Sequence, residues 1–453
     1  MLIVDDSSMR VISKAMGMYE LFEDKVYLVE LLKKKRSPYP KNAPIYFLSP
    51  TIESVNLLIA DWTPNKSRKE PLYADSVYLY FTSAVPNDLF AKIKACKPLI
   101  RRLRAFSEIN IDFIACENRV FHFDMKSATV FSNLFQTNAA NHNPIEVDIV
   151  NKLVTVCASL NEYPHIRYRS SSKVASSIAH LFNNKFNHFV GSNKNWWYNG
   201  DQNHTERGRS TILILSRQDD CLSPLLHEFT YQAMVNDLLQ PQDDKITVSV
   251  PTAEGQEKKD TLLNENDDLW AELRGKHIAD VIKILSSRIR EIVDSNSSVA
   301  IQGNQGRDKP LSMKQMANAL RSLPEYKEVM SKLSQHMDIA HRCMDIFNKS
   351  DLLNLSDVEQ TLATGFNDEG RGVKVSDIFD SVVNQLTVTK DSIDRFRLIA
   401  IFIISQGGLR QSDKDPLLAA ARLSQAEMKA LSSLEKLGYP LVQAARNNRM
   451  SMV

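Results

Sequence analysis

Glycine is scarce in this sequence, with 14 glycines among 453 residues, where an average protein has about 7%. Enzymes that cradle phosphate groups usually do so on glycine-rich loops, so the scarcity disfavours nucleotide-binding enzymes. The patterns GxGxxG, GxxxxGK, HExxH and GxSxG are all missing. The most suggestive acid and histidine neighbours, Asp220 with His227 or Glu228, are explained at least as well by capping and solvation. We therefore predict no catalytic residue, no metal and no cofactor.

Net charge is also nearly absent. Lys and Arg total 56 and Asp and Glu total 54, which leaves a formal net charge of +2. Nucleic-acid binding needs surplus positive charge to neutralise phosphates, so we expect no nucleic-acid partner. Two basic runs, Lys33 to Arg36 and Arg101 to Arg104, have the composition to contact anionic lipid head groups or an acidic protein. A solvated surface is the simpler interpretation, and net charge does not separate the two.

Long hydrophobic segments are missing too. The longest strongly apolar run, residues 398–404, is far shorter than the roughly 20 residues that cross a bilayer. The chain opens Met1-Leu2-Ile3-Val4, without the basic start and long apolar stretch of a secretory signal. Its five cysteines form no CxxC pair, which favours buried small side chains in a reducing compartment. We expect a soluble, intracellular protein.

The length and the pattern of apolar runs predict several domains. A chain of 453 residues corresponds to about three domains of roughly 100 to 200 residues each. In residues 1–133, short runs rich in β-branched or aromatic residues alternate with helix-length segments, as in parallel sheets with crossover helices. We predict a doubly wound α/β domain whose ligand or partner side lies at the strand ends, at residues 5–8 and after residues 48 and 81. The runs are residues 2–4, 26–29, 45–48, 77–81 and 111–114.

The rest of the chain predicts a second α/β region and then a helical region. Residues 134–248 have only one strong strand, 211–215, which is too few for a complete sheet. Residues 249–453 carry apolar residues at three- and four-residue spacing in one helix after another. Ser322 and Ser356 each begin a Ser-x-x-Glu capping box and predict helix starts there. Helical spacing in the second region covers residues 144–160, 177–186 and 226–239.

A methionine-rich apolar stripe in residues 326–344 permits two interpretations. Methionine side chains adapt well to partner helices, so the stripe can be a docking face, and it can also be an ordinary core face. Pro324 stands either just inside a helix start, where its missing amide has no cost, or at a bend between two helices. The stripe consists of Val329, Met330, Leu333, Met337, Ile339 and Met344.

Short motifs in order along nearly the whole chain resemble those of a known family. They are Leu2-Ile3-Val4-Asp5 with Ser8-Met9-Arg10, Ser107-Glu108-Ile109-Asn110-Ile111, Glu162-Tyr163-Pro164 with Arg167-Tyr168-Arg169, Asp268-Leu269-Trp270 with Leu273-Arg274 and Lys276-His277-Ile278-Ala279, and Leu437-Gly438 with Pro440. The chain resembles the SM family (Sec-one and Munc-eighteen type), the cytosolic syntaxin-binding regulators of membrane fusion. The similarity is closest to the exocytic branch.

The resemblance implies an arch of three domains. These are a parallel-sheet α/β domain at residues 1–133, a partial α/β domain at 134–248 and a mainly helical domain at 249–453, with a SNARE-binding hairpin at about 310–347. Family members are not enzymes. They hold a syntaxin-type SNARE between the first and third domains and help it assemble with a vesicle SNARE. The implied role is regulation of SNARE assembly and vesicle docking in exocytosis and protein transport. The implied location is cytoplasmic, peripheral at the plasma membrane or secretory vesicles through syntaxin.

The resemblance also implies a syntaxin-facing surface on the first domain. Arg10 and Arg36 would form forked bonds to carboxylates of a helical bundle. Asp5 and Glu30 would pair with basic residues, and Met9 would add adaptable apolar contact. Asp5 has a second interpretation, as the cap of the first strand-to-helix turn.

Two further sites are implied by the resemblance. Phe113 would line an outer pocket for the N-terminal peptide of syntaxin, although a strand aromatic is otherwise expected in a core. In the hairpin, Pro324 matches the hinge and Tyr326 lies just beyond it. Met337 falls where the vesicle SNARE docks, which favours the docking interpretation of the methionine stripe.

The family pattern extends beyond both ends of this chain, with a helix before Leu2 and a segment after Val453 that completes the second domain's sheet. We therefore expect a truncated second domain with exposed apolar strand surface near residues 212–215, prone to association. One alternative is a truncated isoform that sequesters syntaxin without templating fusion. Another is a small-molecule enzyme on an α/β scaffold, with reactive groups around Asp5, Ser49 or Thr82.

Overall fold

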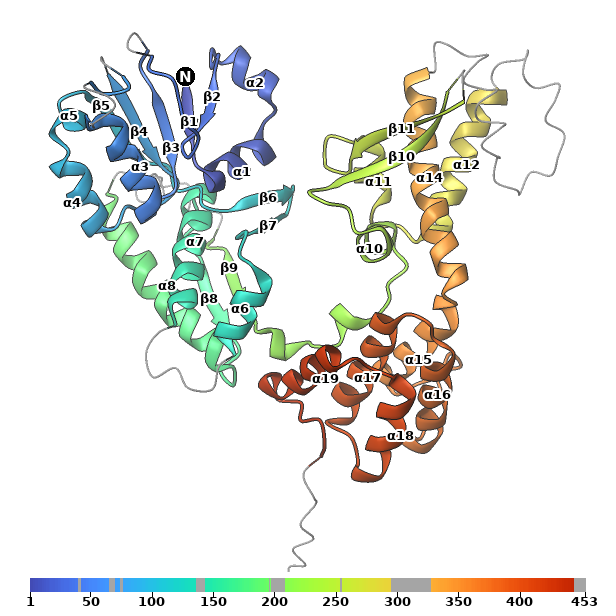
Figure 1. Ribbon diagram of the computed structural model, residues 1–453. Helices are drawn as coiled ribbons and strands as arrows, with labels where there is room; N and C mark the ends of the chain where they lie inside the picture. Colours follow the sequence, from blue (N-terminus) through green and yellow to red (C-terminus); the bar gives the residue numbers. More distant parts are fainter. Residues whose placement is uncertain are drawn as a thin grey trace, which may run out of the picture. The chain divides into compact units, whose positions relative to one another are not determined.

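The computed structural model forms two compact units, unit 1 (Met1–Asp219) and unit 2 (Asp220–Val453) (Figure 1). The division of the chain into three domains, with boundaries at residues 133 and 248, stays a prediction. The structure describes residues 1–39, 42–64, 70–73, 76–135, 143–194, 196, 208–252, 255–294 and 327–443.

Unit 1 is built on a parallel five-stranded sheet with the order β2-β1-β3-β4-β5 (Figure 1). The predicted runs 2–4, 45–48 and 77–81 are confirmed as strands β1, β3 and β4. From β1 the chain continues to β2 on one side of β1 and then returns to β3 on its other side. The strand order therefore reverses between β1 and β3. The strands are β1 (Leu2–Val4), β2 (Val29–Leu31), β3 (Ile45–Leu48), β4 (Val77–Phe81) and β5 (Leu103–Glu108).

Two of the predicted strand runs are wrong in position. The run 26–29 meets β2 only at Val29, and the run 111–114 follows the sheet's last strand instead of forming it. That last strand, β5, is an edge strand and carries the exposed residues Arg104 and Glu108. Edge strands commonly carry charge, so β5 has no continuous apolar run that a search for buried strands would find.

Helices cover both faces of the sheet, which confirms the predicted doubly wound arrangement. Side chains alternate between the faces, as the two-residue period of a strand requires. Tyr46, Leu48, Leu79 and Phe81 are buried against α3, α4 and α5 on one face. Leu2 and Val4 pack with residues of α1 and α2 on the other. The helices are α1 (Asp6–Ala15), α2 (Met18–Glu23), α3 (Ile52–Trp62), α4 (Asn87–Ala95) and α5 (Lys97–Ile100).

The remainder of unit 1 contains two long helices and two small sheets. Helices α7 and α8 pack together around Val150, Phe182 and Phe186, and the predictions at 144–160 and 177–186 are confirmed. Strands β8 and β9 pair in parallel, and within the described residues their sheet has these two strands. The elements are β6 (Ile114–Glu117), β7 (Val120–His122), α6 (Ser127–Leu134), α7 (Pro144–Leu160), β8 (His165–Tyr168), α8 (Lys173–Ser192), β9 (Thr211–Ile214) and η2 (Arg217–Asp219).

Unit 2 is mainly helical, as predicted, with one long antiparallel hairpin, β10–β11. Its first elements are η3 (Ser223–Leu225), α10 (Tyr231–Met234), η4 (Val235–Leu239), β10 (Lys245–Thr252), β11 (Gly255–Leu262), α11 (Asp268–Leu273) and α12 (Ile278–Asp294). They are followed by α14 (Lys327–Lys349), α15 (Leu352–Thr364), α16 (Val375–Val388), α17 (Ser392–Gln406), α18 (Gln411–Ala421), α19 (Gln425–Ser432) and η7 (Ser433–Leu437).

One buried contact explains two errors of prediction in unit 2. The predicted helix 226–239 begins only at Tyr231, because the backbone before it is extended and the N–H of His227 donates to Glu359 at 2.9 Å. Glu359 is therefore not the capping residue of a box that begins at Ser356. Ser356 lies inside α15, where its hydroxyl donates to the carbonyl of Leu353. The predicted box at Ser322 lies outside the described residues.

Two hydrophobic cores organise unit 2. The first surrounds α14 and includes Met330, Leu333 and Met337 together with residues of the β10–β11 hairpin. The second lies among α15 to α19. Phe229, Leu238 and Phe347 pack against both cores, so the two share a boundary of apolar side chains. The methionine stripe is thus mostly a core face, and Val329 is its exposed member.

Candidate protein-interaction surface

Asp5 stands at the strand-order reversal of the unit 1 sheet. It follows β1 directly and caps α1, because its Oδ1 accepts the N–H of Ser8 at 2.8 Å. Its Oδ2 accepts the N–H of Ser49 at 2.7 Å and the hydroxyl of Ser54 at 2.8 Å. The side chain is buried, with a relative exposure of 6%. Asp5 therefore joins the first turn to the β3–α3 connection, and its carboxylate is used within the chain.

Beside this cluster, a hollow of about 820 Å³ lies at the carboxyl ends of β3, β4 and β5, where such sheets bind ligands. Several of its charged groups have partners within the chain. The Nζ of Lys152 lies 2.9 Å from Asp112, and the Oε1 of Glu108 accepts the N–H of Val85 at 2.8 Å. Thr82, one position named for an enzyme, is fully buried. Among the described residues, no group of three or more His, Cys, Asp or Glu side chains is placed to hold a metal ion.

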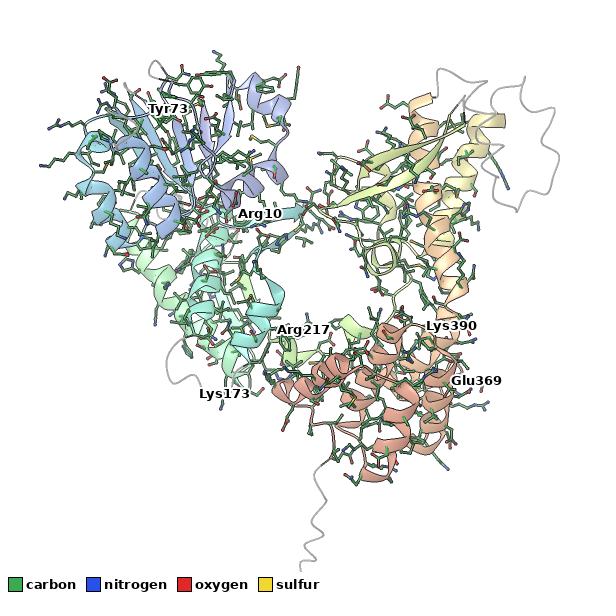
Figure 2. The ribbon with its side chains drawn as sticks, in the orientation of Figure 1. Arg10, Tyr73, Lys173, Arg217, Glu369 and Lys390 are labelled. Atoms are coloured by element: carbon green, nitrogen blue, oxygen red, sulfur yellow. The ribbon has the colours of Figure 1, made fainter. Side chains whose placement is uncertain are left out.

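Helix α1 carries two of the predicted contact residues, Met9 and Arg10. Met9 is half-buried and packs against the core below the helix. Arg10 is exposed, and its Nη2 forms an ion pair with Asp124 at 2.7 Å (Figure 2). Surface ion pairs of this kind contribute little to stability, so the guanidinium can exchange Asp124 for another carboxylate at small cost.

Arg36 differs from its expected placement. Its side chain is buried, and its Nη2 donates to both oxygens of Asp61, each at 2.7 Å. Tyr46 donates to the same carboxylate at 2.8 Å. Burial, followed by the charge of Asp61, raises the pKa of Tyr46 well above its usual value. Because the pair is closed inside the unit, this arrangement does not offer Arg36 to a partner.

Glu30 lies on β2 and is half-buried. Its Oε2 is buried and has no hydrogen-bond partner in the described chain. A carboxylate oxygen in that position is costly unless a donor reaches it, because a buried charged group without partners loses its solvation. Because that oxygen has no exposed surface, a bound protein would meet Glu30 only through the rest of its half-buried side chain.

An apolar patch on and around α2 was missed by the sequence-based prediction. Tyr19 is 73% exposed, and Phe22 and Tyr27 are also more than half exposed. Within α2, Leu21 is the buried residue. The available signal was the number of aromatic and methionine residues in positions 16–27, a composition enriched at protein interfaces. The exposed members of this α2 patch are Met16, Met18, Tyr19, Phe22 and Tyr27.

Phe113 lines a second, smaller cavity in unit 1. The cavity has a volume of about 290 Å³ and lies among α1, the β6–β7 segment, α6 and α7. Phe113 is half-buried and meets Phe121 edge to face, with ring centroids 5.8 Å apart. Burial raises the pKa of Asp148 on the cavity wall, and Lys152 opposes that shift. Apolar lining comes from Val11, Phe113, Ile114, Phe123, Val130 and Ile145.

In unit 2, Met337 is fully buried on α14, with 0% exposure. It faces the core, so it supports α14 from inside and does not contact a partner in this arrangement. Pro324 and Tyr326 lie outside the described residues. The exposed start of α14 instead borders a hollow of about 550 Å³. Its apolar lining is Leu269, Ile292, Val329 and Leu333, and its charged lining is Asp268, Arg288, Glu291 and Lys332.

Comparison with solved structures identifies the class of protein that this fold defines. The chain matches Unc18 of "Crystal structure of the Unc18-syntaxin 1 complex from Monosiga brevicollis" with a TM-score of 0.83 and 26% identity, over 100% of this chain and 77% of that one. The fold is therefore that of the SM proteins. The chain belongs to the Sec1 family, whose model matches residues 1–451.

Curated relatives agree with this assignment. The protein transport protein sec1 of Dictyostelium discoideum is 37% identical over 450 residues, which are 99% of this chain and 71% of the relative. The SNARE-interacting protein KEULE of Arabidopsis thaliana is 30% identical over 456 residues, 98% of this chain but only 66% of the relative. Within the described residues, every helix is too short or too polar to cross a membrane.

Proposed function

We propose that this chain binds a syntaxin-type SNARE and regulates SNARE assembly in vesicle docking and fusion, in exocytosis and protein transport. The observation that carries the proposal is the match of the whole chain to Unc18, a protein solved in complex with syntaxin 1. In this role the chain acts by binding its partner, and it neither catalyses a reaction nor uses a cofactor. It reaches the plasma membrane or secretory vesicles peripherally, through syntaxin.

The proposed syntaxin surface combines Arg10, Met9 and Glu30 with the α2 patch. Interfaces typically have an apolar centre rich in aromatic residues and methionine, with charged groups at the rim. The α2 patch has that composition, Arg10 carries an exchangeable positive charge, and Glu30 is a half-buried acidic residue. A helical bundle with acidic and basic residues beside an apolar stripe fits these groups. Asp5 and Arg36 are proposed to support the surface from inside.

The cavity beside Phe113 is the proposed site for the N-terminal peptide of syntaxin. Its apolar lining suits one hydrophobic side chain of an extended peptide, and Asp148 and Lys152 on its wall provide charged contacts. The start of α14 is the proposed site for a vesicle SNARE or the assembled SNARE complex, near the predicted hinge at Pro324 and Tyr326. There Val329 is exposed, while Met337 holds α14 against its core.

The test is capture of syntaxin by the purified chain. Each exocytic syntaxin of the source organism is offered as its cytosolic fragment, and at least one is expected to bind. Arg10→Glu should weaken that binding by about tenfold, because it places like charge against an acidic partner. Lys173→Glu is the matched control, since Lys173 is an exposed residue at the start of α8 (Figure 2). If no syntaxin binds, or both variants lose affinity equally, the proposal fails.

A further inference from the structure

A dense cluster of positive charge lies on one edge of unit 1. The sequence holds six Lys and Arg residues within positions 92–104 and no acidic residue between Asp88 and Glu108. These residues belong to α4, α5, the turn after α5 and the start of β5. The basic edge is defined as its exposed members, Lys92, Lys94, Lys97, Arg101 and Arg104.

The positive charges of the basic edge are not neutralised within the described chain. None of the five residues forms an ion pair or side-chain hydrogen bond with another described residue. Two other lysines of unit 1 are paired, since Lys33 lies 2.9 Å from Asp6 and Lys152 lies 2.9 Å from Asp112. The positive charge of the basic edge therefore remains available to an external anion.

The cations are each exposed, but they do not all point in one direction. On α4, Leu89 and Ile93 are buried, and a rotation of about 100° per residue places Lys92 and Lys94 on opposite flanks of the outward side. In β5, Leu103 pairs with Val77 and Ala105 with Tyr78, so Arg104 is the extra residue of a bulge. Bulges commonly redirect a side chain at a sheet edge, and β5 is the edge strand (Figure 1).

Apolar side chains stand exposed among the cations. Phe90 is 44% exposed although its ring also contacts Phe106, and Ile100 is 39% exposed. The outward side of α4 also carries the small residues Ala91 and Ala95, together with the exposed Asn87 and Asp88. Asp88 lies one helical turn before Lys92 and is the acidic residue on this side of α4. Cations interspersed with a few large apolar residues are typical of segments that lie on a membrane interface.

We propose that the basic edge binds the anionic head groups of a membrane directly, without a SNARE. Clusters of four to eight Lys and Arg residues are recognised signatures of binding to anionic lipid, and Phe90 and Ile100 would enter the interface beside them. The exposed aliphatic side chain of Ile100 offers no ring on which a base could stack, which favours a lipid surface over single-stranded nucleic acid. This contact goes beyond the proposed function, because it requires no syntaxin.

The experiment is sedimentation of the full chain with protein-free vesicles of phosphatidylcholine, with or without phosphatidylserine. The variant Lys94→Gln, Lys97→Gln, Arg101→Gln is compared with a control, Lys173→Gln, Lys374→Gln, Lys390→Gln. Both sets are exposed, and both lower the formal net charge from +2 to −1, three charges fewer. Since each cation near the surface contributes about a fivefold factor, the first variant should lose on the order of 100-fold in vesicle binding.

The control should bind phosphatidylserine vesicles much as the unaltered chain does. Ile100→Ser should weaken vesicle binding severalfold without any change of charge, and equal melting temperatures would establish that the variants fold. The proposal is overturned if the unaltered chain ignores phosphatidylserine, or if both triple variants lose binding equally. It is also overturned if the basic edge captures single-stranded RNA or an acidic peptide but not vesicles. None of these results depends on syntaxin, so the proposed function is tested separately.

Discussion

The carboxylate of Asp5 accepts the backbone N–H of Ser49 across 2.7 Å, and so ties the end of β1 to the end of β3. These two strands flank the point where the sheet's strand order reverses. In related folds this crevice receives a ligand. Here an internal carboxylate, held by Ser8 and Ser54 as well, occupies the same position.

Asp5→Ala is expected to destabilise unit 1 by about 2 to 4 kcal/mol. The change removes the cap of α1 and leaves buried donors of Ser49 and Ser54 unpaired. Urea unfolding followed by far-ultraviolet circular dichroism measures the loss. Asp6→Asn, at the exposed neighbouring position, should leave the midpoint nearly unchanged. Equal effects at the two positions would show that the Asp5 cluster does not stabilise the sheet.

Arg36→Gln should lower the stability of the fold, and any loss of syntaxin binding should follow from that loss of stability. Removing one member of a buried ion pair costs roughly 3 to 5 kcal/mol, because the other charge, here Asp61, stays buried without its counter-charge. Thermal melting and syntaxin binding are measured together, with Lys35→Gln as the exposed control. Lost affinity at an unchanged melting temperature would instead assign Arg36 to the interface.

The stability of unit 2 should fall as pH rises toward 9 and beyond. His227 lies between Glu359 at 3.0 Å and Asp394 at 3.4 Å. Burial by itself lowers the pKa of His227, but the hydrogen bonds to Asp394 and Glu359 outweigh burial and raise the pKa to about 9. A raised pKa in the folded state gives stability that is complete below the unfolded value of about 6.5 and is lost as pH passes the folded value.

His227→Gln is the variant that tests this dependence. From pH 6 to pH 10, the unaltered chain should lose roughly 3 kcal/mol of unfolding free energy that depends on His227, and the variant should be less stable at pH 6 but flatter across the range. Urea unfolding at several pH values provides the measurement. If the unfolding free energies of the two proteins changed with pH in parallel, the assignment of the proton to His227 would be contradicted.

The β8–β9 sheet should make the protein bind hydrophobic dyes and associate with itself. Leu213 and Leu215 are each 61% exposed, and exposed apolar strand surface promotes association. Leu213→Ser with Leu215→Ser should reduce dye fluorescence and shift the protein toward monomer in sedimentation. Thr211→Ser is the control on the same strand. A dye-silent monomer with one sharp melting transition would refute the expectation.

Much of the fold follows from the sequence because its signals are local. Strands β1, β3 and β4 are short apolar runs between helix-length segments, and most helices of unit 2 show the three- and four-residue spacing of an amphipathic helix. Strand β5 was missed because its outward positions carry charge at a sheet edge. The helix expected from residue 226 begins late because His227 bonds to Glu359, which lies 132 residues further along the chain.

The candidate site was less predictable, because burial depends on partners that are distant in sequence. Nothing near Arg36 indicates that Asp61 will enclose its guanidinium. The methionine stripe has the same period whether it faces a core or a partner, and only packing shows that Met337 is enclosed. The α2 patch was overlooked for the opposite reason, since Phe22 has the composition of a core residue but lies on the surface.

Helix α14 is one continuous element of 23 residues, about 35 Å long at the usual rise per residue. Near its C-terminal end, the ring of Phe347 contacts the ring of Phe229, with centroids 5.0 Å apart. The other end of the same helix carries the exposed Val329. A protein bound at Val329 would therefore contact an element that packs against the boundary between the two cores of unit 2.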